Sequence, residues 1–294
     1  MKKSIRAVLT GVCAFALVGA FALPGCSSQQ QESEQPAEEP AATEETVELQ
    51  MFAANSLEKA MDEVQALYTE ETGVTFADTQ YEASGTLNEM LAGGAYADGL
   101  ITASKGTMDT AVEEGYVDES TRFDMFTNDL VIVVGESSDI TELTLDDLAT
   151  GEYTIAVGDD NVPAGNYAKQ ALSTVGCWVD SEGTTGSDSD GKGGTFDGTP
   201  LAGKVTEGSS VGNVCSYAET GDVQCALVYS SDAYRFDGVK IVGTIPADTH
   251  KNILYPAAVC ADSENAEATA EFLDWAFTNE DAIAIWEAWG FQLA

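Results

Sequence analysis

Apolar residues follow two different spacings, which alternate along the chain from residue 47 onwards. Short apolar runs such as 130–134 and 226–229 predict buried strands, and apolar residues recur at helical spacing between residues 57 and 68. Further strands are expected at 47–53, 73–76, 100–101, 153–157, 239–242 and 255–260, and further helices at 87–91, 108–112 and 266–289. This alternation predicts an α/β fold with mixed, largely parallel sheets.

The first 26 residues have the features of a secretory signal. Three basic residues open the chain, an apolar run covers residues 7–23, and the segment ends in Leu23-Pro24-Gly25-Cys26. A cysteine at this point is typical of a bacterial lipobox, in which Cys26 receives a lipid and becomes the mature N-terminus. An ordinary signal peptide or a membrane anchor helix is the alternative, but the run is short for a span.

Residues 27–47 predict a disordered acidic tether, because they contain six glutamates, no basic residue and almost no large apolar side chain. The remaining residues, 48–294, suffice for one large domain or two lobes.

The chain is strongly acidic, with 50 acidic and 12 basic residues and a formal charge of −38. Removal of the signal takes three basic residues and no acidic ones, so the charge of the mature chain becomes −41. Such a charge excludes nucleic acid as a partner. It also opposes an anionic ligand, although exposed charges are screened beyond roughly 8 Å at physiological salt. A buried anion site would therefore depend on local dipoles.

Four cysteines remain in the exported part: Cys177, Cys215, Cys225 and Cys260. An even number in an oxidising compartment predicts two disulfides, for which we favour Cys177–Cys215 and Cys225–Cys260 among the three possible connectivities. Zinc is disfavoured because the spacings are not CxxC and the single histidine, His250, lies in a polar turn. Free buried thiols are the third possibility.

A segment rich in Gly, Ser and Asp at residues 180–200 interrupts the alternation and predicts a flexible insertion. Its Asp188-Ser189-Asp190-Gly191 stretch resembles part of a calcium loop but lacks the first ligand and the closing glutamate. We therefore expect no metal cation here.

Several helix starts carry groups that could hold an anion. Ser56 and Ser84 each lie where a strand leads into a helix, and either could simply cap that helix. A helix N-terminus also presents unpaired N–H groups and a partial positive charge, so it can bind an anion without Lys or Arg. Ala164 and Val211 follow two further helix starts and could each offer a backbone N–H. Tyr229 ends a strand and could add a hydroxyl donor.

These residues lie in stretches that resemble the periplasmic molybdate-binding proteins of ABC importers, over essentially all of residues 47–294. The matching stretches include Met51-Phe52-Ala53-Ala54-Asn55-Ser56-Leu57, Ala83-Ser84-Gly85-Thr86-Leu87, Val162-Pro163-Ala164-Gly165-Asn166-Tyr167-Ala168 and Leu227-Val228-Tyr229-Ser230-Ser231-Asp232-Ala233. In that family, two serines, two backbone amides and a tyrosine hold the oxyanion. The matching positions are Ser56, Ser84, Ala164, Val211 and Tyr229. The insertion at 180–200 and the four cysteines depart from the family pattern.

The resemblance implies a two-lobe periplasmic-binding-protein fold, with lobe I at 48–126 plus 256–294 and lobe II at 127–255. The ligand, molybdate or tungstate, would bind between the lobes without a cofactor. A site of donors without acceptors suits a fully deprotonated dianion and disfavours a protonated phosphate. The implied partners are an ABC permease and its ATPase, the chain is expected to be a monomer, and its place is extracytoplasmic, anchored to the membrane through Cys26.

Three other functions compete with molybdate import. The ligand could be tungstate or another oxyanion, since donors alone do not select the ion. The chain could also be a surface lipoprotein for sensing or interaction that keeps the fold without transport. An enzyme is disfavoured, because the chain has one histidine and no G-x-S-x-G motif.

Overall fold

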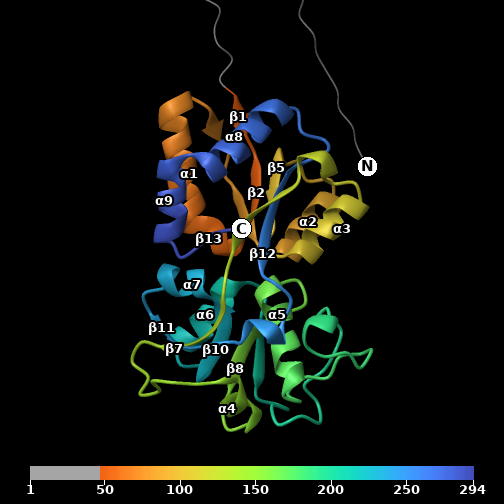
Figure 1. Ribbon diagram of the computed structural model, residues 1–294, viewed down its shortest axis with the longest axis vertical. Coiled ribbons are helices and arrows are strands. Elements are labelled where there is room, and N and C mark those ends of the chain that lie inside the picture. Colours follow the sequence, from red (N-terminus) through yellow and green to blue (C-terminus); the bar gives the residue numbers. More distant parts are fainter. Residues whose placement is uncertain (1–46) are drawn as a thin grey trace, which may run out of the picture. The chain divides into compact units, whose positions relative to one another are not determined.

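The structure is a computed structural model that describes residues 47–294. Within this range the chain forms two lobes, each built around a β-sheet with helices packed on it (Figure 1). The expected signal at 1–26 with Cys26, and the tether up to residue 46, lie outside the described residues. No helix within 47–294 combines the length and apolarity needed to cross a membrane.

Lobe I, as the structure has it, comprises residues 47–127 and 254–294. Its elements are β1 (Glu48–Leu49), β2 (Met51–Ala54), η1 (Asn55–Leu57), α1 (Glu58–Thr72), β3 (Thr75–Phe76), β4 (Gln80–Glu82), α2 (Ser84–Ala92), β5 (Gly99–Ile101), α3 (Lys105–Glu113), η2 (Glu119–Thr121), β6 (Phe123–Thr127), β12 (Leu254–Val259), α8 (Ala266–Thr278), α9 (Glu280–Ala288) and β13 (Gln292–Leu293). The main sheet has the order β13-β6-β12-β5-β2-β4, and β1 pairs separately with β3.

Lobe II comprises residues 128–253. Its elements are β7 (Leu130–Gly135), α4 (Leu145–Ala149), β8 (Ile155–Gly158), α5 (Pro163–Thr174), η3 (Gly186–Asp188), β9 (Val205–Gly208), α6 (Val211–Glu219), β10 (Cys225–Tyr229), α7 (Ser230–Arg235), β11 (Val239–Thr244) and η4 (Ala247–Thr249). The sheet has the order β11-β7-β10-β8-β9.

Both sheets are mixed, and the predicted α/β class is confirmed. In lobe I, β2 runs parallel to β4 and β5, whereas β12 runs antiparallel to β5 and β6. In lobe II, β8 runs parallel to β9 and β10, whereas β7 runs antiparallel to β10 and β11. The antiparallel strands β6, β7, β11 and β12 are those through which the chain passes between the lobes.

Two segments connect the lobes, one between β6 and β7 and one between β11 and β12 (Figure 1). The resemblance placed these crossings after residues 126 and 255. The second crossing enters β12 at Leu254, and the pairing with β6 shifts register between Tyr255 and Pro256. A proline cannot donate a ladder hydrogen bond, which accounts for an irregularity at this point.

Local sequence explains where the main helices begin and end. In α1, Ala60, Met61, Val64 and Tyr68 form the buried face, and the helix ends at Gly73, whose φ of 79° is favourable for glycine. The expected helical stretch at 266–289 is interrupted between α8 and α9. There Asn279 is extended, and its side chain accepts hydrogen bonds from two N–H groups in the first turn of α9.

The predicted disulfides are wrong, because all four cysteines of the described residues are free and buried. Cys215 of α6 packs in one apolar cluster of lobe II, and Cys260 packs in another cluster in lobe I, whereas Cys177 and Cys225 belong to the main core. The favoured Cys225–Cys260 bond would have to join the two lobes. Disulfides require Cα atoms within about 4.4–6.8 Å. Each thiol therefore acts as a small apolar core residue.

We expect the folded domain, purified without reductant, to contain four free thiols. Burial raises the pKa of Cys225 and Cys260 to about 12, so little reactive thiolate forms near neutral pH. A thiol-reactive chromogenic reagent should modify the native protein slowly and all four cysteines rapidly after denaturation. The number of thiols titrated should be the same with and without prior reduction, and a higher number after reduction would contradict the free state.

Candidate functional site

A small cavity of about 10 Å³ lies between the two lobes and brings together groups from both. Lobe I contributes the end of β2, the start of η1, the junction of β4 with α2, and Ala103. Lobe II contributes the starts of α5 and α6 and the end of β10. The lining residues are Ala54, Asn55, Ser56, Glu82, Ala83, Ser84, Ala103, Val162, Pro163, Val211 and Tyr229. Lys and Arg are absent from this lining, and the acidic Glu82 is exposed at its edge.

The structure places four of the five expected ligand residues in this lining: Ser56, Ser84, Val211 and Tyr229. The fifth, Ala164, is 1% exposed and directly follows the lining residue Pro163. Residues that are 173 positions apart in sequence, from 56 to 229, therefore meet at one point between the lobes.

Three helix N-termini converge on this cavity. The helix α2 begins at Ser84, α5 at Pro163 and α6 at Val211. The N–H groups of a first helical turn have no acceptor within their own helix. In α6, the neighbouring N–H of Gly212 is bonded to Asn55 Oδ1 at 3.3 Å, and that of Asn213 is bonded to the capping Ser210 Oγ at 3.2 Å. The convergence gives the cavity a partial positive potential without a formal charge.

The hydroxyl of Ser84 is oriented by the backbone of Ala103. The N–H of Ala103 donates to Ser84 Oγ at 2.9 Å, so the oxygen serves as an acceptor and the hydroxyl hydrogen remains available to donate. The carbonyl of Ala103 in turn accepts the hydroxyl of Tyr229 at 3.0 Å. Ala103 thus connects a lobe I donor to the lobe II tyrosine across the cavity.

The hydroxyl of Ser56 is oriented by a second chain of hydrogen bonds. The amide of Asn128 donates to Tyr255 Oη at 3.3 Å and to Ser231 Oγ at 2.8 Å. The buried Tyr255 hydroxyl lies 3.0 Å from Ser56 Oγ, and either oxygen can be the donor of that bond. When Tyr255 donates, its own proton has an acceptor and the Ser56 proton is free to donate to a ligand.

Both tyrosines keep their protons. Burial raises the pKa of Tyr229 and of Tyr255 well above the ordinary value. The rings lie 5.6 Å apart, and Tyr255 also packs edge-on against Phe291 with centroids 5.5 Å apart. The aromatic packing fixes the phenol that orients Ser56.

Outside the cavity, Arg235 of α7 bonds across the gap between the lobes. Its guanidinium donates to Asn55 O at 2.6 Å and contacts Glu58 Oε2 at 3.3 Å, both in lobe I. On its own helix it pairs with Asp232 at 2.9 Å. Arg235 therefore holds the backbone just before Ser56 against lobe II when the lobes are together.

On the other side of the cavity, Gly85 of α2 contacts the loop between β8 and α5. The N–H of Gly85 donates to Asn161 O at 3.0 Å, and Asn161 Nδ2 donates to Glu89 Oε1 at 3.1 Å. A Cβ built on Gly85 would lie 2.9 Å from Cα, Cβ and Oδ1 of Asn161. The absence of a side chain at this position allows the lobes to approach this closely.

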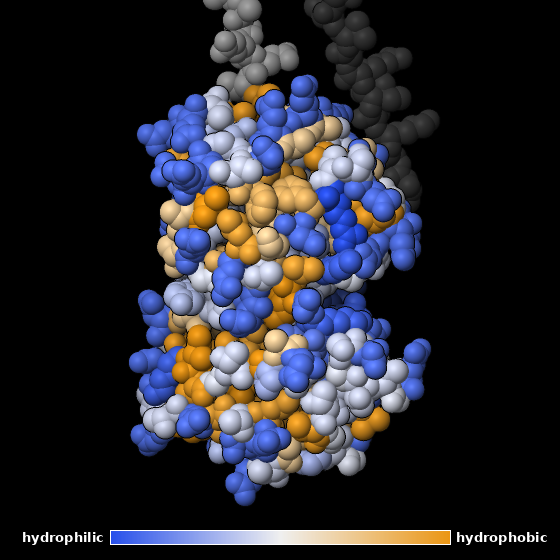
Figure 2. All heavy atoms as spheres, viewed as in Figure 1, coloured by the Kyte–Doolittle hydropathy of each residue, from blue (hydrophilic) through white to orange (hydrophobic). Residues whose placement is uncertain are grey.

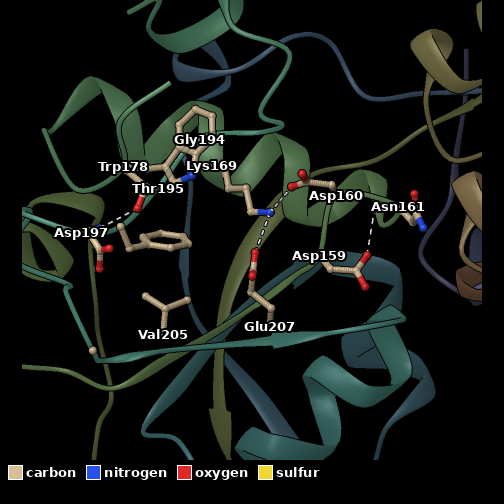
Figure 3. Close-up of a pocket in the computed structure, with 12 residues that line it drawn as sticks. Asp159, Asp160, Asn161, Lys169, Trp178, Gly194, Thr195, Asp197, Val205 and Glu207 are labelled. Carbon is tan, nitrogen blue, oxygen red and sulfur yellow. Dashed lines mark hydrogen bonds and ion pairs between the residues drawn. The ribbon is translucent and has the colours of Figure 1, made fainter. Parts of the chain in front are cut away.

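A larger cavity, of about 590 Å³, lies within lobe II beside α5 and the 180–200 segment (Figure 3). Its buried cation, Lys169, lies between Asp160 and Glu207, with both carboxylates at 2.7 Å. Burial opposes ionisation of Asp160, but the hydrogen bonds from Lys169 and Gly193, together with the charges of Lys169 and Lys192, lower its pKa. Because Lys169 is fully paired, this cavity offers an anion no free cation. Residues 47–294 also contain no group of three or more His, Cys, Asp or Glu able to hold a metal ion.

Sequence reasoning did not identify the residues that orient and close the site: Tyr255, Asn128, Arg235 and Asn161. Tyr255 and Asn128 act from the two crossing segments, 127 positions apart, and Arg235 contacts a residue 180 positions away. The helical spacing and strand patterns carry no signal for such contacts. A polar Asn128-Asp129 pair directly before the apolar strand β7 was the one local sign of a crossing point.

Two lobes that meet over a small cavity lined with neutral donors define a two-lobed binding protein. Residues 49–292 match a family described as bacterial extracellular solute-binding protein, and the chain belongs to this family. It is 32% identical over 249 residues to the molybdate-binding protein ModA of Escherichia coli, covering 83% of this chain and 88% of that protein.

Two further relatives cover most of the chain. YvgL of Bacillus subtilis, whose name describes a substrate-binding lipoprotein of an ABC transporter, is 28% identical over 291 residues, which is 99% of each protein. A solved substrate-binding domain of a molybdenum ABC transporter from Clostridium difficile is 28% identical with a TM-score of 0.60. The match covers 85% of this chain and 100% of the Clostridium difficile domain.

We expect Gly85→Ala to weaken ligand binding while leaving the fold intact. The new methyl group would contact Asn161 only when the lobes are together, and overpacking of this kind costs about 1–3 kcal/mol. Calorimetric titration with an oxyanion would measure the loss. Ser137→Ala, in the exposed turn after β7, is the control, because Ser137 does not line the cavity between the lobes. Equal affinities for the two variants would show that closure does not depend on Gly85.

Proposed function

We propose that this protein captures a doubly charged tetrahedral oxyanion, molybdate in the first place, and delivers it to an ABC permease driven by its ATPase. The 32% identity to a molybdate-binding protein over 83% of the chain supports the ligand class. The lipoprotein name of YvgL supports the proposed lipid anchor on Cys26. We also propose that the protein acts as a monomer, without a cofactor and without catalysis.

One observation carries the proposal: the two serine hydroxyls that face the cavity can both donate to a ligand. Ser84 accepts from the Ala103 N–H, and Ser56 accepts in the same way when Tyr255 donates to it, so both serine protons are then free to point to a ligand. Hydrogen bonds to an ionised acceptor are roughly twice as strong as bonds between neutral groups. Low dielectric between the lobes strengthens them further.

The same donor arrangement favours a fully deprotonated ion over a protonated one. A protonated phosphate brings its own O–H, which needs an acceptor, whereas the five expected ligand groups, three hydroxyls and two backbone N–H groups, all serve as donors to the ion. An unpaired buried donor costs about 1–3 kcal/mol. Molybdate and tungstate have the same charge and shape, so these bonds treat the two ions alike, and tungstate is the alternative ligand.

Binding requires the lobes to separate and close again. A cavity of about 10 Å³ has room for roughly one water-sized sphere, which is smaller than a tetrahedral oxyanion. The ion therefore enters an open form and displaces the Tyr229 hydroxyl from Ala103. Each lobe supplies part of the ligand shell, so the bound ion favours the closed state.

We expect Ser56→Ala and Ser84→Ala each to weaken molybdate binding by about 1–3 kcal/mol, because each removes one charge-assisted donor. Calorimetric titration of residues 47–294 with molybdate, tungstate, sulfate and phosphate would measure the losses and the order of preference. Ser137→Ala is the matched control, since Ser137 is exposed in the loop after β7. Unchanged molybdate affinity in both site variants would refute the assignment.

A further inference from the structure

The distribution of paired and unpaired cations is uneven over residues 47–294. This range contains nine basic residues. Four of them, Lys59, Arg122, Lys169 and Arg235, form ion pairs. Two more direct their ammonium groups at backbone carbonyls: Lys204 at Gly151 O, and Lys240 at Glu136 O and Ser138 O. Among the described residues, Lys105, Lys192 and Lys251 remain with neither kind of partner.

Two of these three lysines line one cavity, and the third, Lys105, is next to its lining in the sequence. A cavity of about 220 Å³ separates the start of α3 in lobe I from α5 and the 180–200 segment in lobe II, and Lys192 and Lys251 line it. Lys105 stands in the chain between two other lining residues, Ser104 and Gly106. We call this space the mouth cavity. In Figure 2, hydrophilic residues line an indentation between the two lobes at the right-hand edge of the molecule.

The mouth cavity adjoins the site between the lobes. Pro163, at the start of α5, lines both spaces. Tyr167, one turn further along α5, lines the mouth cavity and packs against Tyr229 with ring centroids 6.4 Å apart. An ion in the mouth cavity is therefore separated from the site by the first turn of α5 and by the ring of Tyr229, which lines the site.

The 180–200 segment is anchored so that Lys192 reaches this position. Ser189 Oγ donates to Asp180 at 2.5 Å and accepts the N–H of Gly191 at 3.0 Å. Gly191 has a φ of 73° and packs so tightly on Asn166 O of α5 that no Cβ would fit. The N–H of Gly193 donates to Asp160 Oδ2 at 3.0 Å. The backbone on both sides of Lys192 is thus fixed, whereas its ammonium group is free.

Lys251 is positioned in a similar way, because its N–H donates to the buried Gln170 Oε1 at 2.9 Å. One carboxylate, Asp190, lines the same cavity, and Lys192 also helps to lower the pKa of nearby Asp160 after the larger effect of Lys169. The two unpaired ammonium groups of the lining, those of Lys192 and Lys251, nevertheless outnumber its one acidic residue. The mouth cavity is therefore locally positive on a protein whose formal charge is −38.

We propose that the mouth cavity is an entry vestibule that attracts the oxyanion and raises its rate of association. The inference rests on the proposed function and gives the 180–200 segment a role in it. A protein with this negative charge repels a dianion at long range, and a local cluster of cations offsets that repulsion near the entrance. Clefts lined by charge of one sign raise association rates by factors of about 10 to 1,000, and the effect falls with ionic strength. Because Asp190 also lines the mouth cavity, its effect belongs at the lower end of that range. The lysines do not complete the ligand shell, so they act on the rate of entry.

The test compares two triple variants of equal net charge. One replaces the vestibule lysines (Lys105→Gln, Lys192→Gln, Lys251→Gln), and the control replaces lysines elsewhere (Lys59→Gln, Lys204→Gln, Lys240→Gln). Stopped-flow measurement of tyrosine and tryptophan fluorescence, with molybdate as the probe, gives association and dissociation rate constants at several salt concentrations. Tyr229 and Tyr255 at the site supply a local signal. Thermal unfolding verifies that both variants are folded.

We expect the vestibule variant to associate about tenfold more slowly at low salt, with the difference shrinking as salt rises and the dissociation rate nearly unchanged. The control should change by less than about twofold. An equal loss in both variants, or no loss in the vestibule variant, would overturn the inference and leave the proposed function standing. Absence of binding of molybdate, tungstate, sulfate and phosphate to the unaltered protein would instead overturn the proposed function and the vestibule with it.

Discussion

The orientation of two hydroxyl protons is the interaction on which the site depends. Ser84 accepts from the Ala103 N–H, and Ser56 shares a hydrogen bond with Tyr255, which is itself fixed by Asn128. With Tyr255 as the donor, both serines have a proton free to donate into the cavity. Since Asn128 lies in a crossing segment and Tyr255 at the end of the other, the donor polarity of Ser56 depends on how the chain passes between the lobes. The fold therefore determines the sign of the charge that the site accepts.

A strongly acidic protein that binds an anion must keep its carboxylates away from the binding site. Within residues 47–294, two buried cations are paired with carboxylates, as Lys169 is with the exposed Asp160 and Glu207 and Arg235 is with the buried Asp232. Neutral dipoles at three helix starts supply the potential at the site. This division leaves the binding cavity free of formal positive charge, where a fixed cation would bind many anions without discrimination.

The sequence was sufficient for those features that depend on local pattern. The apolar strands and the amphipathic helix α1 follow from spacing, and Ser84 and Val211 are visible as helix starts. Short polar strands such as β4 and β9 gave no such signal, because their positions are set by pairing with β2 and β8. The disulfide prediction was wrong for a related reason. An even number in an exported chain predicts disulfides, but only the packing shows that Cys215 and Cys260 lie in separate clusters.

The contacts that hold the lobes together could not be predicted from local sequence patterns either. Arg235 reaches Asn55, and Gly85 meets Asn161, across the gap between two independently built sheets. The five ligand residues were predicted from the resemblance to a family, since five scattered residues cannot be joined by spacing alone. The resemblance did not predict Asn128 and Tyr255, because these residues act on the ligand only through Ser56.

A crystal structure of residues 47–294 grown with molybdate would test the central claim most directly. The account predicts one tetrahedral ion between the lobes, accepting hydrogen bonds from the hydroxyls of Ser56, Ser84 and Tyr229 and from the N–H groups of Ala164 and Val211. No Lys or Arg should lie within ion-pair distance of the ion. A cavity without the ion, or an ion held instead by Lys192 and Lys251 at the surface, would contradict it.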